Sequence, residues 1–361
     1  MKIIHIVESF GGGVYSYFKD LAMFFSQHSD IETYIIYSNK RKEITQDQID
    51  QDFPSSIHLI PLEMERELKP IQDLRSTFAL RKTIKQLRPD IIHLHSSKAG
   101  VIGRWASSMP NYKRKVFYTP HGYSFLRQDI SPVKQKIFYT IEKLTQLIFG
   151  GTTIACGDTE YKLAQRIGTS LLVRNGIDLT HLNQHYIANE NTSNQLTIGT
   201  IGRISYQKNP KLFNEVALLF PQHQFLWIGD GELRDQLTAP NITISGWFTN
   251  NTAVFPYLNQ LDIYMQTSLW EGLPIAVLEA MAFRKPILAT DVIGNNDIVE
   301  PNINGFLFTQ ANDLSSKIEQ LEDAYFRKKI GEQAYIICEE KFDKNKNFSQ
   351  LLEIYTANNT R

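Results

Sequence analysis

The sequence predicts an α/β fold made of two doubly wound domains. Apolar runs of strand length alternate with longer segments of helical periodicity, which is typical of parallel sheets covered by helices. This alternation begins at Lys2 and begins again at Leu196. The length of 361 residues is also more than a single hydrophobic core usually organises. We therefore expect two similar domains joined by one linker.

The first half of the chain is expected to alternate between strands and helices. Strands are predicted at 2–7, 31–37, 57–60, 90–94, 116–119, 153–155 and 170–173. Helical periodicity covers 14–27, 71–87, 133–149 and 160–167, and a further helix is expected from about Gly100. The polar stretch 41–53 interrupts this pattern, so we expect it to be a loose surface connection.

The second half repeats the pattern after a break. The stretch 175–195 is rich in Asn, Asp, His and Thr and poor in aliphatic residues, which predicts the junction between domains 1–175 and 176–341. Strands are predicted at 196–201, 224–228, 242–244, 263–266, 286–290 and 305–308, with helices between them. The tail from about Ser315 is expected to be helical.

Composition excludes several classes of function. The formal net charge is zero, which argues against a nucleic-acid partner. The only cysteines are Cys156 and Cys338, which favours a reducing cytoplasm over a disulfide-rich secreted protein. The N-terminus is too short and too polar for a signal peptide. No run of about 18 apolar residues predicts a membrane span.

The segment from Glu271 to Glu279 combines an uncapped helix start with two carboxylates. Pro274 suits the first turn of a helix, and Leu273 before it has no side-chain oxygen to cap that turn. The open N–H donors for an anion are then those of Gly272, Leu273, Ile275 and Ala276. Glu279 lies on the helix and leans toward its N-terminus. Two carboxylates beside a phosphate site should bind hydroxyl groups, and a nucleotide sugar has both hydroxyls and a diphosphate.

Two cations follow the first strand of the second domain. Arg203 and Lys208 stand just beyond the strand at 196–201, where ligands of parallel sheets usually bind. They can neutralise a diphosphate, and the guanidinium can contact two oxygens at once. The alternative is a pair of solvated loop charges.

Two further motifs lie in the first domain. Gly11, Gly12 and Gly13 follow the first strand and let backbone approach a ligand closely. A third glycine and a ribose-binding acid are missing, which argues against NAD, and a simple turn is the alternative. His121 follows the strand at 116–119 between Pro120 and Gly122. That position favours a site over an exposed or structural histidine.

Taken together, these motifs resemble the retaining GT-B glycosyltransferases of the large GT4-type family. The segments that carry the resemblance are EGLPIAVLEAMA (271–282), Gly202-Arg203 followed by Lys208, WIGDGEL (227–233), RNGID (174–178), the three glycines and TPHG (119–122). They occur in the order of the family and span nearly the whole chain. The resemblance implies two Rossmann-like domains that face each other across a cleft, with a C-terminal helix at about 342–361 that packs back on the first domain.

The resemblance also implies roles for individual residues. Donor-binding residues would be Gly12, Gly13, Arg203, Lys208, Gly272, Leu273, Ile275 and Glu279, and catalytic residues would be His121, Arg203, Lys208 and Glu271. Within these sets, Glu271 and His121 would face the donor sugar and Glu279 would hold the ribose. No metal or other cofactor is expected, because the chain supplies its own cations and has no Asp-x-Asp at a strand end.

The implied reaction is retaining transfer from a nucleotide-diphosphate sugar, with UDP as the expected nucleotide, to a saccharide acceptor. By analogy the acceptor is lipid-linked, as in capsule, O-antigen or exopolysaccharide synthesis. His95 and Lys98 are candidate acceptor contacts, although the serines beside them could be ordinary helix caps. The alternatives are a nucleotide-sugar epimerase or hydrolase of the same fold and a non-catalytic nucleotide-sugar-binding subunit.

The expected location is cytoplasmic, and peripheral contact with the inner face of the cell membrane is a further hypothesis. The basic and aromatic segment 123–149 could dock on anionic lipid. The alternative, a half-buried helix with solvated lysines, is slightly favoured because Asp129 and Glu142 dilute its positive charge.

Overall fold

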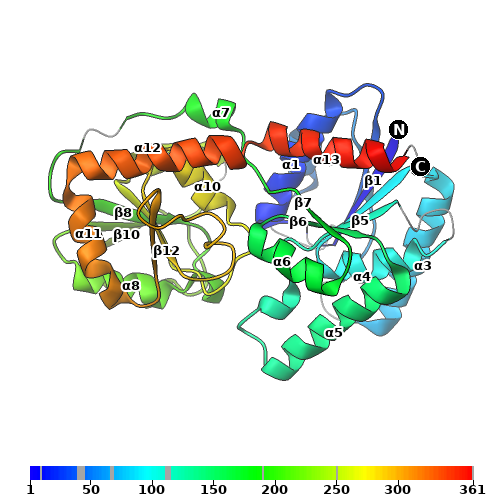
Figure 1. Ribbon diagram of the computed structural model, residues 1–361, viewed down its shortest axis with the longest axis horizontal. Helices are drawn as coiled ribbons and strands as arrows, with labels where there is room; N and C mark the ends of the chain where they lie inside the picture. The colour runs from blue at the N-terminus through cyan, green and yellow to red at the C-terminus, as the bar shows by residue number, and fades with distance from the viewer. Residues whose placement is uncertain are drawn as a thin grey trace. The chain divides into compact units, whose positions relative to one another are not determined.

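The chain divides into two compact units, which are described separately here. The structure is a computed structural model that describes residues 1–8, 10–38, 45–65, 69–109, 115–188, 191–248 and 251–359. The first unit contains Met1–Asn175 and the C-terminal segment from Lys344, and the second contains Gly176–Asp343 (Figure 1). The division falls where the aliphatic-poor stretch begins.

The first unit is a parallel sheet covered by helices on both faces. Its strands are β1 (Lys2–Val7), β2 (Glu32–Tyr37), β3 (His58–Pro61), β4 (Ile91–His95), β5 (Val116–Thr119), β6 (Thr152–Ala155) and β7 (Ser170–Leu172). Its helices are α1 (Gly12–Ser26), α2 (Gln46–Asp52), α3 (Pro70–Leu87), α4 (Ser97–Ala106), α5 (Pro132–Phe149), α6 (Asp158–Ile167) and α13 (Lys344–Asn359), with a 3₁₀ turn η2 (Ser124–Leu126). The strand order is β3-β2-β1-β4-β5-β6-β7, so the direction in which successive strands are added reverses between β1 and β4.

The two faces of this sheet have separate cores. Helices α3, α4 and α6 pack on one face, against the alternate strand residues that include Ile4, Ile92 and Tyr118. Helices α1 and α13 pack on the other face and lie side by side (Figure 1). Because both faces are covered, strands such as β1 read as nearly continuous apolar runs. The C-terminal helix α13 buries Tyr355 completely and belongs to this unit.

The second unit repeats the architecture with one strand fewer. Its strands are β8 (Thr197–Ile201), β9 (Gln224–Ile228), β10 (Ile242–Ile244), β11 (Ile263–Gln266), β12 (Ile287–Thr290) and β13 (Gly305–Phe308). Its helices are α7 (Leu179–Asn183), α8 (Pro210–Leu219), α9 (Phe255–Gln260), α10 (Ile275–Ala282), α11 (Ser315–Glu322) and α12 (Ala324–Lys341). It also has the 3₁₀ turns η3 (Tyr206–Lys208), η4 (Arg234–Gln236), η5 (Asn251–Val254) and η6 (Ala311–Leu314). The strand order β10-β9-β8-β11-β12-β13 changes direction between β8 and β11.

The predicted strands are confirmed, with boundaries that agree within a residue or two, and one connection differs from its prediction. The expected loose stretch 41–53 contains helix α2, although 41–44 lie outside the described residues. The Thr45 side chain caps α2, and Ile49 inserts into the core of the unit. The sequence of this segment is too polar to predict a helix, because only one of the helix residues is a buried isoleucine. The other contacts that hold α2 are tertiary: Tyr15 and Lys19 of α1 bind Asp52 at its end.

One smaller difference concerns the start of helix α10. Pro274 is the residue before α10 and not its first residue, because its ψ of 108° is extended. Its carbonyl oxygen still accepts the first helical hydrogen bond, from the N–H of Val277. Among the helices of the described residues, none is both long enough and apolar enough to span a membrane.

Candidate functional site

The carboxyl edge of the second sheet gathers the charged residues that the sequence singled out. β8 and β11 are neighbours at the point where the strand order changes direction, and such a point is where open α/β sheets bind ligands. The loop after β8 carries Arg203 and Lys208, and the loop after β11 carries Glu271 and leads into α10. Parallel pairing therefore brings segments more than 60 residues apart to one edge.

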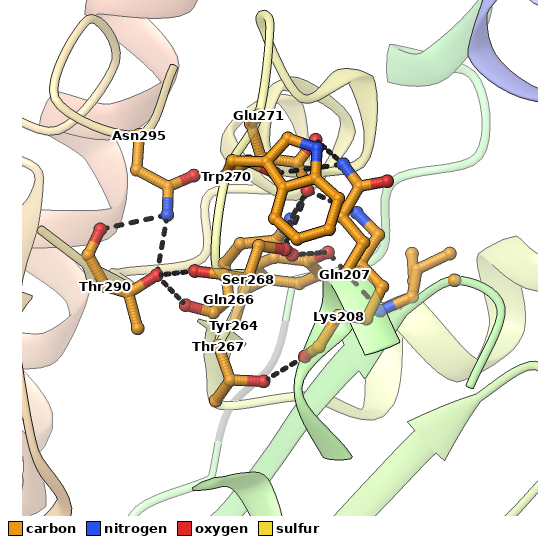
Figure 2. Close-up of polar contacts among 12 residues, drawn as sticks. Gln207, Lys208, Tyr264, Gln266, Thr267, Ser268, Trp270, Glu271, Thr290 and Asn295 are labelled. Atoms are coloured by element: carbon orange, nitrogen blue, oxygen red, sulfur yellow. Dashed lines mark hydrogen bonds and ion pairs between the residues drawn. The ribbon is translucent and has the colours of Figure 1, made fainter. Parts of the chain in front are cut away.

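Glu271 is the centre of a hydrogen-bond network at this edge (Figure 2). Its side chain is buried, with 8% of the residue exposed. Its Oε1 accepts from Lys208 Nζ at 2.7 Å, Ser268 Oγ at 2.7 Å and Gln266 Nε2 at 2.9 Å, and its Oε2 accepts from Gln207 Nε2 at 3.3 Å. Four donors, one of them charged, offset the desolvation of this carboxylate. The pair with Lys208 is the only one of these contacts that joins opposite charges.

A second layer of hydrogen bonds holds the loop after β11 in place. Thr290 Oγ1 donates to the carbonyl oxygen of Ser268 at 2.5 Å, and Asn295 Nδ2 donates to the carbonyl oxygen of Thr290 at 2.9 Å. Thr267 Oγ1 donates to the carbonyl oxygen of Lys208 at 2.7 Å. These bonds connect the ends of β8, β11 and β12, so the Lys208–Glu271 pair rests on a rigid support.

Tyr264 lies beneath the same network. Its hydroxyl group donates to Gln266 Oε1 at 3.1 Å. Burial raises the pKa of Tyr264 strongly, and the carboxylates of Glu279 and Glu271 raise it further. The tyrosine therefore stays protonated and donates a hydrogen bond toward the negative side of the site.

Gly294 brings the loop after β12 against the Glu271 loop. Its φ of +88° lies in the left-handed region that favours glycine. A Cβ at this position would lie 2.7 Å from the carbonyl oxygen of Gly272 and 2.7 Å from Glu271 Cβ. Any larger residue would push the loop that carries the carboxylate out of place.

Arg203 has a different environment from Lys208. It is exposed, and its Nε lies 2.9 Å from Oε2 of Glu232, which follows β9. Exposed ion pairs contribute little free energy, so the guanidinium can exchange this partner for a ligand anion. The structure therefore pairs Lys208 with Glu271 and leaves Arg203 on the surface of the same edge.

Helix α10 starts directly after this network, and its first turn is open. In the described part of the chain no side chain caps it, and its first turn holds no acidic residue. The N–H groups of Ile275 and Ala276 belong to this turn, and those of Gly272 and Leu273 precede it. Glu279 stands one turn further along α10 and is half-buried.

A chain of histidines occupies the corresponding edge of the first unit. The register of β1 and β4 places His5 beside His93 and Val7 beside His95. His5 Nδ1 lies 3.0 Å from His95 Nε2, and His95 Nδ1 lies 3.0 Å from Nε2 of His121, which follows β5. Three rings thus form a continuous hydrogen-bonded chain from the buried sheet to the loop after β5.

Burial keeps these rings uncharged. It lowers the pKa of His5 to about 3 and that of His121 to about 4, and it lowers the pKa values of His93 and His95 well below the usual value. Each neutral ring carries one N–H and one acceptor nitrogen. The protons in the chain must therefore all point in one direction or all in the other.

The buried end of the chain favours one direction. His5 Nε2 is buried among aromatic rings and has no hydrogen-bond partner in the described structure. An orphaned N–H is rarer in proteins than an orphaned acceptor, which places the His5 proton on Nδ1. His5 then donates to His95, and His95 donates to His121 Nε2. The remaining proton of His121 is on Nδ1, where it can be donated to a ligand.

The grouping of His5, His93 and His95 also has the composition of a metal site. Their ligand nitrogens lie within 4.8 Å of one another. However, both nitrogens of His93 are used, one by Thr119 Oγ1 at 2.9 Å and the other by the Tyr355 hydroxyl group. The 3.0 Å separation between His5 and His95 is a hydrogen-bond distance. We therefore interpret the cluster as a hydrogen-bond network.

The loops at this edge adopt unusual backbone conformations. Ser96, after β4, and His121, after β5, have φ angles of +72° and +52°. Residues other than glycine rarely adopt such angles, and they concentrate at functional sites. Gly12, with φ of +56°, and Gly13 are exposed at the start of α1, and a Cβ on either would meet no atom within 4 Å.

Comparison with known proteins identifies the chain. A family model described as glycosyltransferase family 4 matches residues 11–181, and one described as glycosyl transferases group 1 matches residues 195–323. The two matches together span most of the chain. The chain belongs to the family 4 and group 1 glycosyltransferases.

Relatives of this glycosyltransferase have modest sequence identity. The UDP-Gal:alpha-D-GlcNAc-diphosphoundecaprenol alpha-1,3-galactosyltransferase of Escherichia coli is 28% identical over 288 residues, which cover 71% of each chain. An uncharacterized 41.2 kDa protein in the cps region of Klebsiella pneumoniae is 28% identical over 384 residues, which cover 99% of this chain and 100% of the relative.

Solved structures confirm the predicted fold class. Sucrose-phosphate synthase from Thermosynechococcus elongatus has a TM-score of 0.80 at 15% identity and covers 99% of both chains. Anabaena Alr3699/HepE, solved in complex with UDP and glucose, has a TM-score of 0.79 at 19% identity and covers 99% of this chain and 100% of its own. The glycosyltransferase therefore has the GT-B fold, with two Rossmann-like units built on parallel sheets.

The two predicted acceptor contacts of the glycosyltransferase lie in buried positions. His95 is fully buried, and both of its nitrogens are used within the histidine chain. Lys98 is 8% exposed, and its Nζ lies 2.6 Å from Oδ1 of Asp73. The sequence shows which residues follow β4, but not that α3 and the histidine chain bury them. Neither side chain is available to an acceptor in this structure.

Sequence reasoning also missed several residues of both networks. Tyr264, Gln266 and Ser268 were not singled out, although a polar Gln-Thr-Ser run directly after an apolar strand is a usable signal. His93 and His95 alternate along one strand, a spacing that places both on one face. Nothing in the sequence pairs them with His5, because that pairing depends on which strands are neighbours.

Proposed function

We propose that this glycosyltransferase transfers a sugar from a UDP-sugar to a lipid-linked saccharide acceptor with retention of the anomeric configuration. The observation that carries the proposal is the Lys208–Glu271 pair at the β8/β11 edge, directly before the open N-terminus of α10. The name of the E. coli galactosyltransferase, which includes both UDP-Gal and a diphosphoundecaprenol-linked saccharide, supports the donor and acceptor classes. The O-antigen biosynthesis glycosyltransferase WbnH of E. coli, 26% identical over 269 residues, supports a role in bacterial surface-polysaccharide synthesis.

The donor diphosphate would bind between cations and backbone N–H groups. Lys208 and Arg203 would neutralise the phosphate oxygens, and the first turn of α10 would donate hydrogen bonds to them. Glu279 would accept hydrogen bonds from the ribose hydroxyls. Because the structure ties Lys208 to Glu271, we infer that Glu271 orients the ammonium group in addition to its expected contact with the sugar.

Catalysis would then depend on stabilising the leaving group. When the bond between the anomeric carbon and the diphosphate oxygen breaks, negative charge grows on the UDP and positive charge grows on the sugar. Preorganised cations and N–H donors stabilise the first charge at low reorganisation cost. The acceptor oxygen forms the new bond to the anomeric carbon on the face that the UDP leaves, and its proton passes to the departing phosphate oxygen.

His121 has a separate task in this proposal. It is neutral because burial lowers its pKa to about 4, so it is a poor source of positive charge. With its proton on Nδ1, it would donate a hydrogen bond to a hydroxyl group of the donor sugar. This contact would position the anomeric carbon and would not remove the acceptor proton.

The test is turnover by the purified protein with a panel of UDP-sugars, each with and without an undecaprenyl-diphosphate-linked saccharide. Acceptor-dependent release of UDP is expected, and the NMR coupling constant of the new anomeric proton should report retention. UDP release without acceptor would support a hydrolase or epimerase instead. Binding of UDP without any turnover would support a non-catalytic subunit.

A further inference from the structure

Helix α5 of the first unit is turned with its polar side inward. Its buried residues are Glu142, Thr145 and Gln146. Its large aliphatic residues are exposed instead, among them Leu147 at 79% and Ile148 at 63%. An amphipathic surface helix normally buries its apolar stripe, so α5 has the reverse orientation.

Buried polar partners explain this orientation. Arg104 of α4 is buried, and its Nη2 donates to Gln146 Oε1 at 2.8 Å, while its Nη1 lies 3.8 Å from Glu142 Oε2. Tyr118 on β5 donates to the other oxygen of Glu142 at 2.8 Å. The guanidinium group needs these oxygens because a buried charge must be paired. The polar side of α5 is therefore held inward, and its apolar side must face outward.

The outward side of α5 is an apolar stripe between lysines. Val133, Ile137, Leu144 and Ile148 recur at helical spacing and are exposed, with Leu147 beside them. Projected around the helix, Lys136 and Lys143 border one edge of this stripe and Lys134 borders the other. All three lysines are exposed, and among the described residues none forms an ion pair with a carboxylate. This arrangement is typical of helices that lie in a lipid interface.

The neighbouring helices α3 and α4 also expose apolar residues, and α3 exposes basic residues as well. α4 packs between α3 and α5 on one face of the sheet. α3 exposes Ile71 and Phe78, and α4 exposes Trp105. The exposed cations of α3 are Arg75, Lys82 and Lys85. Only two acids occur on the three helices: Asp73, which binds Lys98, and the buried Glu142. In a chain with zero net charge, the three neighbouring helices α3, α4 and α5 are thus basic and apolar.

We propose that the outer faces of α5 and α3 form a docking surface for an anionic lipid bilayer. The apolar stripe inserts among the acyl chains near the headgroups, and the bordering lysines contact the lipid phosphates. A second copy of the chain is a poorer partner, because a symmetric contact would bring like-charged lysines together. The surface lies entirely within the first unit.

Docking would also place the histidine edge of the first unit near the bilayer. The chain leaves β5 at its carboxyl end, passes His121 and η2, and enters α5 at Pro132. Val133 and Lys134 are therefore on the side of the sheet where the histidine chain ends. The benefit for a lipid-linked acceptor rests on the proposed function, whereas the docking itself does not.

Vesicle flotation of the full chain tests the proposal. Phosphatidylcholine vesicles are compared with vesicles that contain about one-third phosphatidylglycerol, because the cytoplasmic lipid charge is what the lysines would bind. Binding is expected only to the anionic vesicles, and it should weaken as salt is raised. Equal binding to both vesicles, or to neither, would overturn the proposal. A failure of sugar transfer would not affect this result.

Two sets of variants distinguish the apolar and the charged contributions. Lys136→Gln with Lys143→Gln should weaken partitioning about 25-fold, at roughly fivefold for each lysine near the surface. The matched control is Lys328→Gln with Lys329→Gln on α12 of the second unit, where both lysines are exposed. The control should bind as the parent chain does, and equal losses in both pairs would contradict a local surface.

The apolar variant combines Leu144→Ser, Leu147→Ser and Ile148→Ser in one chain. It should weaken partitioning of the protein onto anionic vesicles by at least about tenfold. Its control is Leu218→Ser with Leu219→Ser on α8, where both leucines are about half exposed. Unchanged thermal midpoints would show that each variant folds. Sedimentation velocity completes the test: a dimer in the parent chain that the α5 variant dissolves would assign this surface to a second copy and overturn the proposal.

Discussion

The Lys208–Glu271 pair should contribute a large coupling free energy to the stability of the second unit. The perturbation is a double-mutant cycle of Lys208→Met, Glu271→Gln and the double variant. The two groups lie 2.7 Å apart, and their side chains are 20% and 10% exposed. At an effective dielectric constant of about 20, two charges about 4 Å apart attract by roughly 4 kcal/mol before desolvation.

The net effect of each single substitution should be smaller than that attraction. Removing one partner of a fully buried pair costs about 3–5 kcal/mol. In Lys208→Met, however, Glu271 keeps the donors of Gln266, Ser268 and Gln207. We therefore expect each single variant to lose about 2–3 kcal/mol of unfolding free energy. The double variant should lose less than the sum by about 1.5–3 kcal/mol, the range for a hydrogen bond to a charged group.

The assay is urea unfolding followed by tryptophan fluorescence. Trp227, Trp247 and Trp270 belong to the second unit and Trp105 alone to the first, so the signal reports mainly the unit that carries the pair. Far-ultraviolet circular dichroism is a second probe, because Trp270 lies beside the substituted residue.

A surface pair in the same unit provides the control. Lys341 Nζ lies 2.6 Å from Glu300 Oε1, and their side chains are 42% and 40% exposed. The corresponding cycle should give a coupling below about 1 kcal/mol. If the Lys208–Glu271 coupling were no larger than this value, burial would not strengthen the pair and the reasoning would be refuted.

Three further predictions concern the nucleotide, metals and pH. Glu279→Gln should weaken UDP binding by about 1.5–3 kcal/mol in calorimetry, and an unchanged affinity would remove Glu279 from the ribose site. Turnover should persist in EDTA, because the cations are those of the chain, and a loss that Mg²⁺ restores would contradict this. As pH falls below about 6.5, the free energy of unfolding of the first unit should decrease, because the unfolded chain binds protons that the buried rings of His5, His93 and His95 do not. Each of the three histidines should contribute a decrease of about 1.4 kcal/mol per pH unit. Hydrogen exchange of β1 and β4, corrected for the intrinsic rate, should then rise more than that of β8 and β11, and equal changes in both units would count against the prediction.

The sequence by itself determined the order of strands and helices. Strands β1, β5, β9, β11 and β13 have the boundaries that their apolar runs predicted, because a strand covered on both faces is a local, continuous signal. The position of Arg203, Lys208 and Glu271 after strands was equally local. Since carboxyl ends of parallel strands share one edge, their common location followed from the fold class alone.

Only the tertiary structure decided which of these groups contact each other. The sequence suggested that Arg203 and Lys208 act as a pair of cations, but Lys208 binds Glu271 and Arg203 binds Glu232. The partner of a charge depends on strand order and on the desolvation of each position. Neither can be obtained from spacing along the chain.

The same limit applies to the first unit. The histidine chain requires β4 to lie between β1 and β5, a neighbour relation that joins His5, His95 and His121 across more than 110 residues. The orientation of α5 likewise depends on Arg104, which lies on another helix. A hydrophobic pattern tells which residues share a helix face, but the buried charge that must be paired decides which face turns inward.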